Sequence, residues 1–241
     1  MRKRPVWDYF IFNGRNCMDF NVKMSEADYG SAERDITSVE VPGRSGDLTL
    51  DNGRFKNRKM KIPAYIAKDF ESSLAAFMAF LLQDSEYHRY EDTYHPDYYV
   101  MARFSGPFEP TSVSFGEAGA FVLEFNRQPQ KWLKSGEIAV QVTSAAPVVL
   151  NNPTPFTARP LIRVTAGTGT ITVGDTVVEL SANNGATIID SEAQECYEGS
   201  TNRNSDLVLT TGTFPELKPG QSQISVGAGM TIEITPRWWR I

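Results

Sequence analysis

The two histidines are the first residues to consider for catalysis or metal binding, because an imidazole ring serves both. His88 and His95 are the only histidines in the 241-residue chain. Three carboxylates that could complete a metal site follow closely, namely Glu91, Asp92 and Asp97. The spacing matches no common zinc motif, and charged and aromatic residues interleave here as in a polar loop. We therefore expect a solvated aromatic loop, with a metal site as the alternative, and we expect no cofactor.

Carboxylates in the second half of the chain are the next candidates for chemistry. They gather near one predicted strand end, at Asp190, Glu192, Glu195 and Glu198. A glycosidase needs two carboxylates opposed across a sugar-binding cleft, whereas acidic residues at turns are common without any catalytic role. No Gly-x-Ser-x-Gly elbow surrounds a serine, and neither glycine cluster has the strand-loop-helix context of a phosphate site. The sequence predicts no catalytic residue, so we expect a protein that is not an enzyme.

Two adjacent tryptophans close to the C-terminus are candidates for contact with a partner or a ligand. Trp238 and Trp239 are flanked by Arg237 and Arg240. Neighbouring residues on a strand point to opposite faces, so one indole can fill the core while the other meets a partner. Packing or assembly is favoured over ligand binding, and the sequence leaves open which ring faces outward.

The composition changes part-way along the chain and indicates two domains. Residues 1–134 hold 22 of the 27 aromatic side chains, while the later residues are rich in Val, Ile, Thr and Gly, as short strands and turns require. Repeated prolines lie between these halves. We predict a first domain over residues 1–134, a linker and entry to the second domain over residues 135–155, and a second domain over residues 156–241.

In the first domain the sequence predicts hairpins and one helix. Residues 36–41 and 47–50 read as strands around a turn, and Asp51-Asn52-Gly53 predicts a second turn before a strand that reaches Ile66. Asp69 is a predicted cap for a helix ending near Leu82. Its apolar face is expected to hold Phe70, Leu74, Phe77, Met78 and Leu81.

The second domain has the pattern of an all-β fold. Six short strands are predicted, over residues 161–164, 170–173, 177–180, 187–190, 223–226 and 230–234. Turn residues such as Gly174-Asp175 separate them. Short strands at this spacing are typical of a β-sandwich.

Charge, hydropathy and cysteine content exclude several classes of protein. The net charge of -5 argues against a sequence-independent binder of duplex DNA. No apolar run is long enough to cross a bilayer, so we expect no membrane insertion and synthesis in the cytosol. Cys17 and Cys196 are far apart in the sequence and are expected to be buried free thiols.

Several short motifs follow one another in an order that resembles one family. In the first half they are FNGRNCMDF (12–20), ERDI (33–36), VEVPGRSG (39–46), DNGRFKN (51–57) and FNRQPQKW (125–132). In the second half they are NNPT (151–154), IDSE (189–192), FP (214–215) with PG (219–220), and PRWW (236–239). Together they span nearly the whole chain, which resembles the distal tail proteins of siphophages that infect Gram-positive hosts.

The resemblance implies both a fold and a role. The fold is mainly β with one helix: an N-terminal α+β ring-forming domain built from a β-sandwich, a helix and a β-hairpin, then a C-terminal galectin-like β-sandwich. The role is a hexameric ring hub at the distal end of the virion tail, linking the tail tube to tail-tip or baseplate proteins. DNA passes through its lumen without specific binding. The host, and whether the source is a phage or a prophage, are left open.

The candidate ring interface is the first hairpin, because an unpaired hairpin edge is suited to subunit pairing. Its residues are Arg34, Asp35, Ile36, Val41, Pro42, Gly43, Arg44 and Gly46. An ordinary hairpin within the domain is the alternative. The alternative function is a carbohydrate-binding module for host adhesion, although a galectin site needs a histidine and none follows His95.

Overall fold

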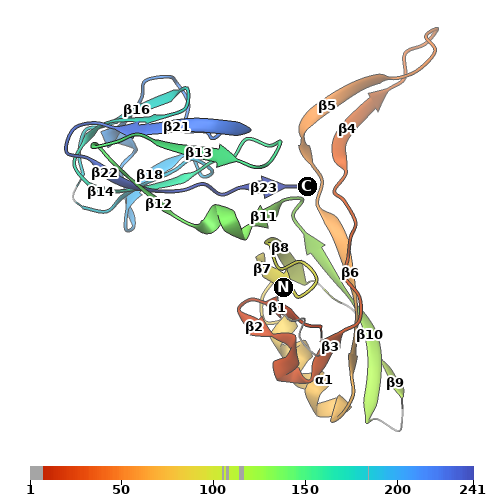
Figure 1. The fold of residues 1–241 in the computed structure, drawn as a ribbon. Coiled ribbons are helices and arrows are strands. Elements are labelled where there is room, and N and C mark those ends of the chain that lie inside the picture. The colour runs from red at the N-terminus through yellow and green to blue at the C-terminus, as the bar shows by residue number, and fades with distance from the viewer. Residues whose placement is uncertain (1–7, 105, 107–108, 114–116, 184) are drawn as a thin grey trace. The chain divides into compact units, whose positions relative to one another are not determined.

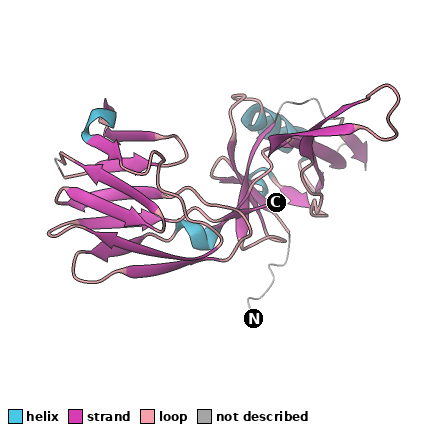
Figure 2. Cartoon of the chain, turned by 90° about the horizontal axis from the view of Figure 1, so that it is seen from above, coloured by secondary structure: helices cyan, strands magenta, loops and turns pink. Residues whose placement is uncertain are grey.

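A computed structural model describes residues 8–104, 106, 109–113, 117–183 and 185–241 (Figure 1). The chain divides into two compact units, one formed by residues 1–131 with Ile241 and the other by residues 132–240. Strands dominate both units (Figure 2), and α1 (Phe70–Leu81) is the one α-helix among the described residues. This is the mainly β fold with one helix that the resemblance implied.

One antiparallel sheet forms the main body of the first unit. Its strands run in the order β2-β1-β7-β8-β10-β6-β3, and β9 pairs with β10 beside this path. Their bounds are β1 (Phe10–Phe12), β2 (Arg15–Asn16), β3 (Val22–Met24), β6 (Arg58–Ile66), β7 (His88–Asp92), β8 (Tyr98–Phe104), β9 (Thr111–Val113) and β10 (Ala118–Arg127). The longest ladder joins β6 to β10 over nine residue pairs, from Arg58↔Arg127 to Ile66↔Gly119.

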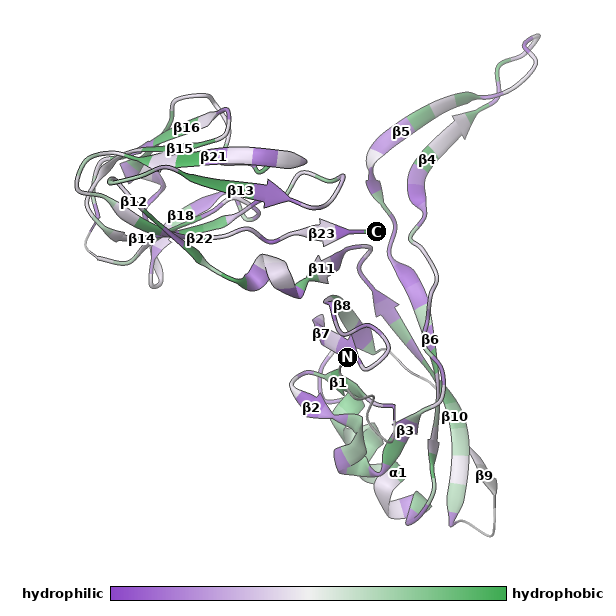
Figure 3. Cartoon of the chain, viewed as in Figure 1, coloured by the Kyte–Doolittle hydropathy of each residue, from purple (hydrophilic) through white to green (hydrophobic). Residues whose placement is uncertain are grey.

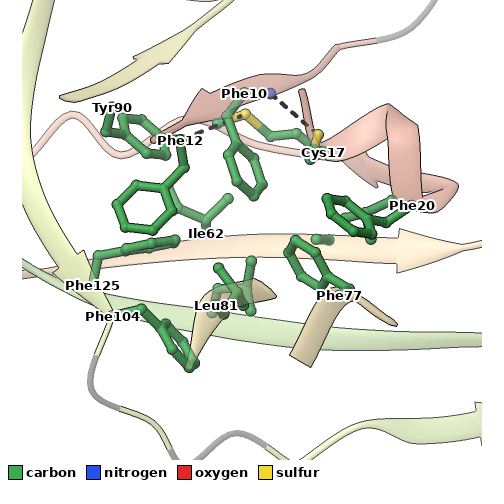
Figure 4. Packing of buried hydrophobic residues seen from close by; sticks show 14 of the residues in the cluster. Phe10, Phe12, Cys17, Phe20, Ile62, Phe77, Leu81, Tyr90, Phe104 and Phe125 are labelled. Atoms are coloured by element: carbon green, nitrogen blue, oxygen red, sulfur yellow. Dashed lines mark hydrogen bonds between the residues drawn. The ribbon is translucent and has the colours of Figure 1, made fainter. Parts of the chain in front are cut away.

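The core of the first unit lies on one face of this sheet. Alternate residues of β6 are buried, namely Met60, Ile62, Ala64 and Ile66, as the alternating sequence predicted. Phe77 of α1 lies among Phe10, Phe20 and Phe121, with ring centroids 5.5 to 6.3 Å apart. Figure 4 shows Phe77 with Phe10 and Phe20 in this cluster. Such tilted aromatic contacts add to the stabilisation from buried apolar area.

The predicted helix is confirmed, but its predicted cap is wrong. Asp69 occupies the N-cap position with φ 53° and makes no capping hydrogen bond through its side chain. Phe70, Phe77 and Leu81 are buried as expected, together with Ser73 and Phe80. Tertiary packing of the aromatic face therefore holds the helix in place more than its cap does.

A separate two-stranded sheet forms the predicted first hairpin. It consists of β4 (Arg34–Val39) and β5 (Leu48–Phe55), which pair only with each other among the described strands. The predicted second turn at Asp51-Asn52-Gly53 is wrong, because these residues lie inside β5. Gly53 has φ 71° where the pairing register shifts, so its left-handed conformation forms a bulge and the chain continues in the same strand.

The second unit is a β-sandwich. One sheet has the order β12-β22-β14-β17-β18-β19 and the other has the order β13-β21-β15-β16-β20. The bounds are β12 (Val140–Thr143), β13 (Val148–Asn152), β14 (Leu161–Ala166), β15 (Gly169–Val173), β16 (Thr176–Leu180), β17 (Thr187–Asp190), β18 (Glu195–Glu198), β19 (Thr201–Asn202), β20 (Leu207–Leu209), β21 (Gly220–Val226) and β22 (Thr231–Thr235). Apolar residues of both sheets form one buried cluster, as the two inner faces of a sandwich do.

All six strands predicted for the second half are present, and the structure adds others. Residues 135–155, expected to be a linker and an entry to the second domain, include β12 and β13, which pair with β22 and β21. The terminal strands β11 (Lys131–Leu133) and β23 (Trp239–Arg240) also pair, and three short 3-10 helices complete the described elements: η1 (Cys17–Phe20), η3 (Lys134–Glu137) and η4 (Asn204–Asp206).

Two expectations about the whole chain can be compared with the structure. Cys17 and Cys196 are both buried and free, as predicted, and burial raises the pKa of Cys17 to about 12. Among the described helices there is none with the length and hydropathy to cross a membrane.

Replacing Phe77 tests whether α1 is held mainly by its aromatic core. Phe77→Ala is expected to lower the free energy of unfolding by about 3–5 kcal/mol, because the ring is fully buried and leaves a cavity. The control is Leu82→Ala, just beyond the helix, where the residue is 54% exposed and a change within about 0.5 kcal/mol is expected. Urea unfolding measures both, and equal losses would contradict this account of the core.

Candidate functional site

The expected solvated aromatic loop is wrong for residues 88–92, because they form strand β7 and Tyr90 is buried. Each histidine has its own carboxylate neighbour. His88 Nε2 is 2.7 Å from Asp84 Oδ1, and His95 Nδ1 is 3.0 Å from Asp92 Oδ1. The His95 ring also packs edge-on against Tyr29. Within the described part of the chain no three His, Cys, Asp or Glu residues come together as metal ligands would. The arrangement is that of two separate local His–Asp contacts.

Two of the acidic candidates, Asp190 and Glu198, are engaged in structural contacts. Arg237 donates two hydrogen bonds to Asp190, at 2.7 and 3.0 Å, and Asp190 Oδ1 also accepts from the backbone amides of Glu192 and Ala193. Glu198 forms an ion pair with Arg203 at 3.0 Å. Burial raises the pKa of Asp190, but the hydrogen bonds from Arg237 and Ala193 outweigh it, so the pKa lies below its ordinary value. Asp190 thus closes a turn as a charged acceptor.

The two tryptophans pack within the second unit. Trp238 is buried in the core of the sandwich. The Trp239 ring stacks on Phe156 with centroids 4.4 Å apart, and its Nε1–H donates to the carbonyl of Thr157 at 3.0 Å. Both indoles therefore have intramolecular partners, which favours the packing interpretation of this pair.

The predicted interface residues lie along the hairpin and at its turn. Arg34, Asp35 and Ile36 belong to β4, and the others belong to the segment between β4 and β5. At the turn, the Arg44 amide donates to the Val41 carbonyl at 3.1 Å, with Pro42 second and Gly43 third at φ 80°. This is the geometry of a type II turn, which needs a residue of positive φ at the third position.

The hairpin register places a set of exposed apolar residues on one face. Val39 lies opposite Leu48, and Thr37 lies opposite Leu50, so these four side chains share a face. Val39, Leu48 and Leu50 are 42%, 44% and 56% exposed. We call these three residues the hairpin patch, and Figure 3 shows the hydrophobic colouring on β4 and β5.

Ion pairs across the hairpin stabilise the half nearer the sheet. Arg34 pairs with Asp51 at 2.6 Å, and Arg54 pairs with Asp35 at 2.7 Å. The hydrogen bond from Arg54 lowers the pKa of Asp35 below its ordinary value. Two of the predicted interface residues, Arg34 and Asp35, thus have partners within the hairpin.

The sequence analysis did not predict the hairpin patch, and the interface residues that it did predict lie on both faces of the hairpin. Ile36 lies opposite Asp51, on the face away from the patch. The signal for the patch was the alternation of Thr37 and Val39 with Leu48 and Leu50. Reading it required the register between the two strands, which the turn at 41–44 and the bulge at Gly53 determine.

The fold of both units is similar to that of solved phage tail and baseplate proteins. The crystal structure of SPP1 Dit (gp 19.1), described as a paradigm of the hub adsorption apparatus in phages that infect Gram-positive hosts, is similar with a TM-score of 0.74 and 17% identity over 97% of this chain and 99% of that one. A chain of the activated phage P2 baseplate with Ca is similar with a TM-score of 0.54 and 8% identity over 95% and 98% of the two chains. The same baseplate with Sr gives 0.53 and 8% over 98% and 99%.

These matches confirm the fold that the resemblance to distal tail proteins implied. They cover nearly the full length of both chains, so both units belong to the shared architecture. No protein-family model matches the sequence, and no curated protein matches it either. At such low identity the fold, rather than any particular residue, is what the chains have in common.

The pH dependence of stability tests the role of Asp190. An aspartate has a pKa of about 3.9 when unfolded, and the folded pKa is lower, so its contribution is present above about pH 4 and is lost as the pH falls through the folded pKa. Wild type should be more stable than Asp190→Asn at pH 7, and this difference should shrink below about pH 4. Urea unfolding of the second unit measures it, with exposed Glu195→Gln as the control; a difference independent of pH would refute the prediction.

Proposed function

We propose that this chain is a structural subunit of a phage tail hub, in which copies assemble as a ring between the tail tube and the tail-tip or baseplate proteins. The observation that carries the proposal is the hairpin of β4 and β5, which has an exposed apolar patch and no other strand partner among the described strands. Its occurrence in a chain with the fold of SPP1 Dit supports a role in assembly.

An exposed hairpin with apolar residues is unfavourable for a subunit that stays alone. Each outer edge carries backbone donors and acceptors that no other described strand pairs with, and such edges pair readily with other chains. Burying the patch against a second copy removes Val39, Leu48 and Leu50 from water. In this proposal the hairpin patch of one copy contacts a different surface of the next copy, so the interface is heterologous. Such an interface generates a closed ring when the rotations between successive subunits add up to a full turn.

We propose a structural role and no catalysis. Three of the residues that could carry out chemistry have intramolecular partners: His88 with Asp84, His95 with Asp92, and Asp190 with Arg237. The affinity for other subunits then comes from an extended surface repeated around the ring.

The finer features of the proposal come from the resemblance. They are six-fold symmetry, a central channel through which DNA passes without specific binding, and location at the distal end of the virion tail. The net charge of -5 is compatible with such a channel, since a strongly basic protein would retain DNA. Carbohydrate binding through Trp238 and Trp239 is not put forward, because both rings pack within their own unit.

A single charge in the hairpin patch tests the proposed interface. Leu50→Asp introduces a carboxylate that the contact would bury without a partner, which is expected to cost about 2 kcal/mol or more, some thirtyfold in Kd. Light scattering coupled to size exclusion should show an oligomer for wild type and a monomer for the variant.

The matched control is Val208→Asp, a similarly exposed apolar residue at 54% on β20 of the second unit. It should leave the oligomer intact. Wild type that stays monomeric at all concentrations, or an equal loss of assembly in both variants, would overturn the proposed interface.

A further inference from the structure

The root of the hairpin is the place where it leaves the main sheet of the first unit. β5 ends at Phe55 and β6 begins at Arg58, so only two residues separate the hairpin from the sheet. At the root, the Lys56 amide donates to the Glu33 carbonyl at 2.8 Å and joins the segments that enter and leave the hairpin. Because the hairpin lacks another ladder partner among the described strands, its direction depends on the side chains around this root.

Two arginines and one aspartate hold the root on the core face of the sheet. Arg58 and Arg127 are opposite each other at the end of the β6–β10 ladder. Arg58 Nη2 donates to the Asp28 carboxylate at 2.8 Å, and that carboxylate also accepts from the backbone amides of Gly30 and Lys61. Arg127 is 2% exposed and donates through Nη2 to the Gly30 carbonyl at 3.2 Å.

These contacts attach the segment before β4 to the end of the ladder. The Gly30 backbone lies directly on the Arg58 guanidinium, where a Cβ atom would come within 2.1 Å of Nη1. Burial and the neighbouring charge of Arg58 lower the pKa of Arg127. Asp28 is hydrogen-bonded to the partly buried Arg58, and its charge also acts on the buried Arg127. A buried charge such as that of Arg127 is strongly sensitive to loss of a neighbouring opposite charge.

Three polar side chains hold the root on the opposite face. Asn126 precedes Arg127 on β10, so its side chain points to the other side of the sheet. Asn57 Nδ2 donates to the Tyr87 hydroxyl at 2.6 Å and lies 3.2 Å from Asn126 Oδ1. The Tyr87 hydroxyl donates to the same Oδ1 at 3.0 Å, which closes a triangle around residue 57.

We infer that these two sets of contacts fix the direction of the hairpin relative to its own sheet, and thereby the angle between neighbouring subunits. We call them the root contacts: Asp28, Arg58 and Arg127 with Gly30 on one face, and Asn57, Tyr87 and Asn126 on the other. The inference rests on the proposed function and names the residues that position the subunit contact.

The physical reason is that a heterologous contact closes into a ring only at particular rotation angles. The hairpin patch determines whether two subunits bind, since its residues are the ones removed from water. The root contacts determine the angle at which they bind. A hairpin that swings about residues 56–57 can still bind a neighbour, but the oligomers then vary in subunit number or stay open.

The first test compares the sizes of the oligomers. In Asp28→Asn, mass photometry and negative-stain microscopy should show a mixed population in which the ring fraction falls about threefold or more from the single wild-type species. Asp175→Asn, which removes an exposed ion pair with Lys218 in the second unit, is the control and should resemble wild type. A variant that keeps one ring species of unchanged size would overturn the inference.

Tyr87→Phe tests the other face with a smaller change. It removes the hydroxyl of the triangle and retains the ring on which Arg103 packs at 5.3 Å, so the chain should fold even if Asp28→Asn does not. Tyr197→Phe on β18 is the matched control for loss of one hydroxyl. We expect the mixed population of oligomers for Tyr87→Phe only. A change in the oligomer sizes of both variants, or of neither, would contradict the role inferred for the root contacts.

The second test measures the hairpin direction without assembly. Spin labels on Thr49→Cys in the hairpin and Ala120→Cys on β10, in the Leu50→Asp background, report the distance between the hairpin and its sheet; Cys17 and Cys196 are buried and stay unlabelled. The distance distribution should be narrow and should become at least twice as wide after Asp28→Asn or Tyr87→Phe. An unchanged width refutes the positioning role, even if wild type proves monomeric and the proposed function fails.

Discussion

The ladder between β6 and β10 is the contact on which the rest of the first unit depends. It contains nine residue pairs. β6 follows the hairpin in the sequence, and β10 precedes the second unit. On its core face it supports the aromatic cluster around Phe77, and at its end Arg58 and Arg127 lie opposite each other. The same two strands carry residues that pack in the core beneath α1 and the arginines at the hairpin root. Any displacement along this ladder would therefore move the core and the root together.

Patterns local in the sequence predicted much of the fold. The helix followed from apolar residues at helical spacing between 70 and 81, and β6 followed from alternation between Met60 and Ile66. The predicted turn at Asn52-Gly53 failed because positive φ at a glycine suits a bulge as well as a turn, and only pairing with β4 distinguishes them. The strands of residues 140–152 were missed because their partners, β21 and β22, lie about 70–90 residues later.

The division of the hairpin residues between its two faces was not predicted, for the same reason. The turn at Pro42-Gly43 marked the hairpin, but the division of its residues between two faces depends on register. The root contacts join Asp28 to Arg58 and the Gly30 carbonyl to Arg127, across 30 and 97 residues. Their side chains are ordinary charged residues in the sequence, and only the β6–β10 ladder brings the two arginines together.

The central claim is that one subunit's hairpin patch contacts a neighbouring subunit, and site-specific photo-crosslinking measures this most directly. A photoreactive amino acid at position 50 of the purified full chain, with position 208 as the control of similar exposure, is irradiated at the concentration where the chain oligomerises. The account predicts covalent dimers and longer ladders from position 50 and monomer from position 208. Crosslinks confined to a single chain at position 50, in a sample that is oligomeric, would contradict it.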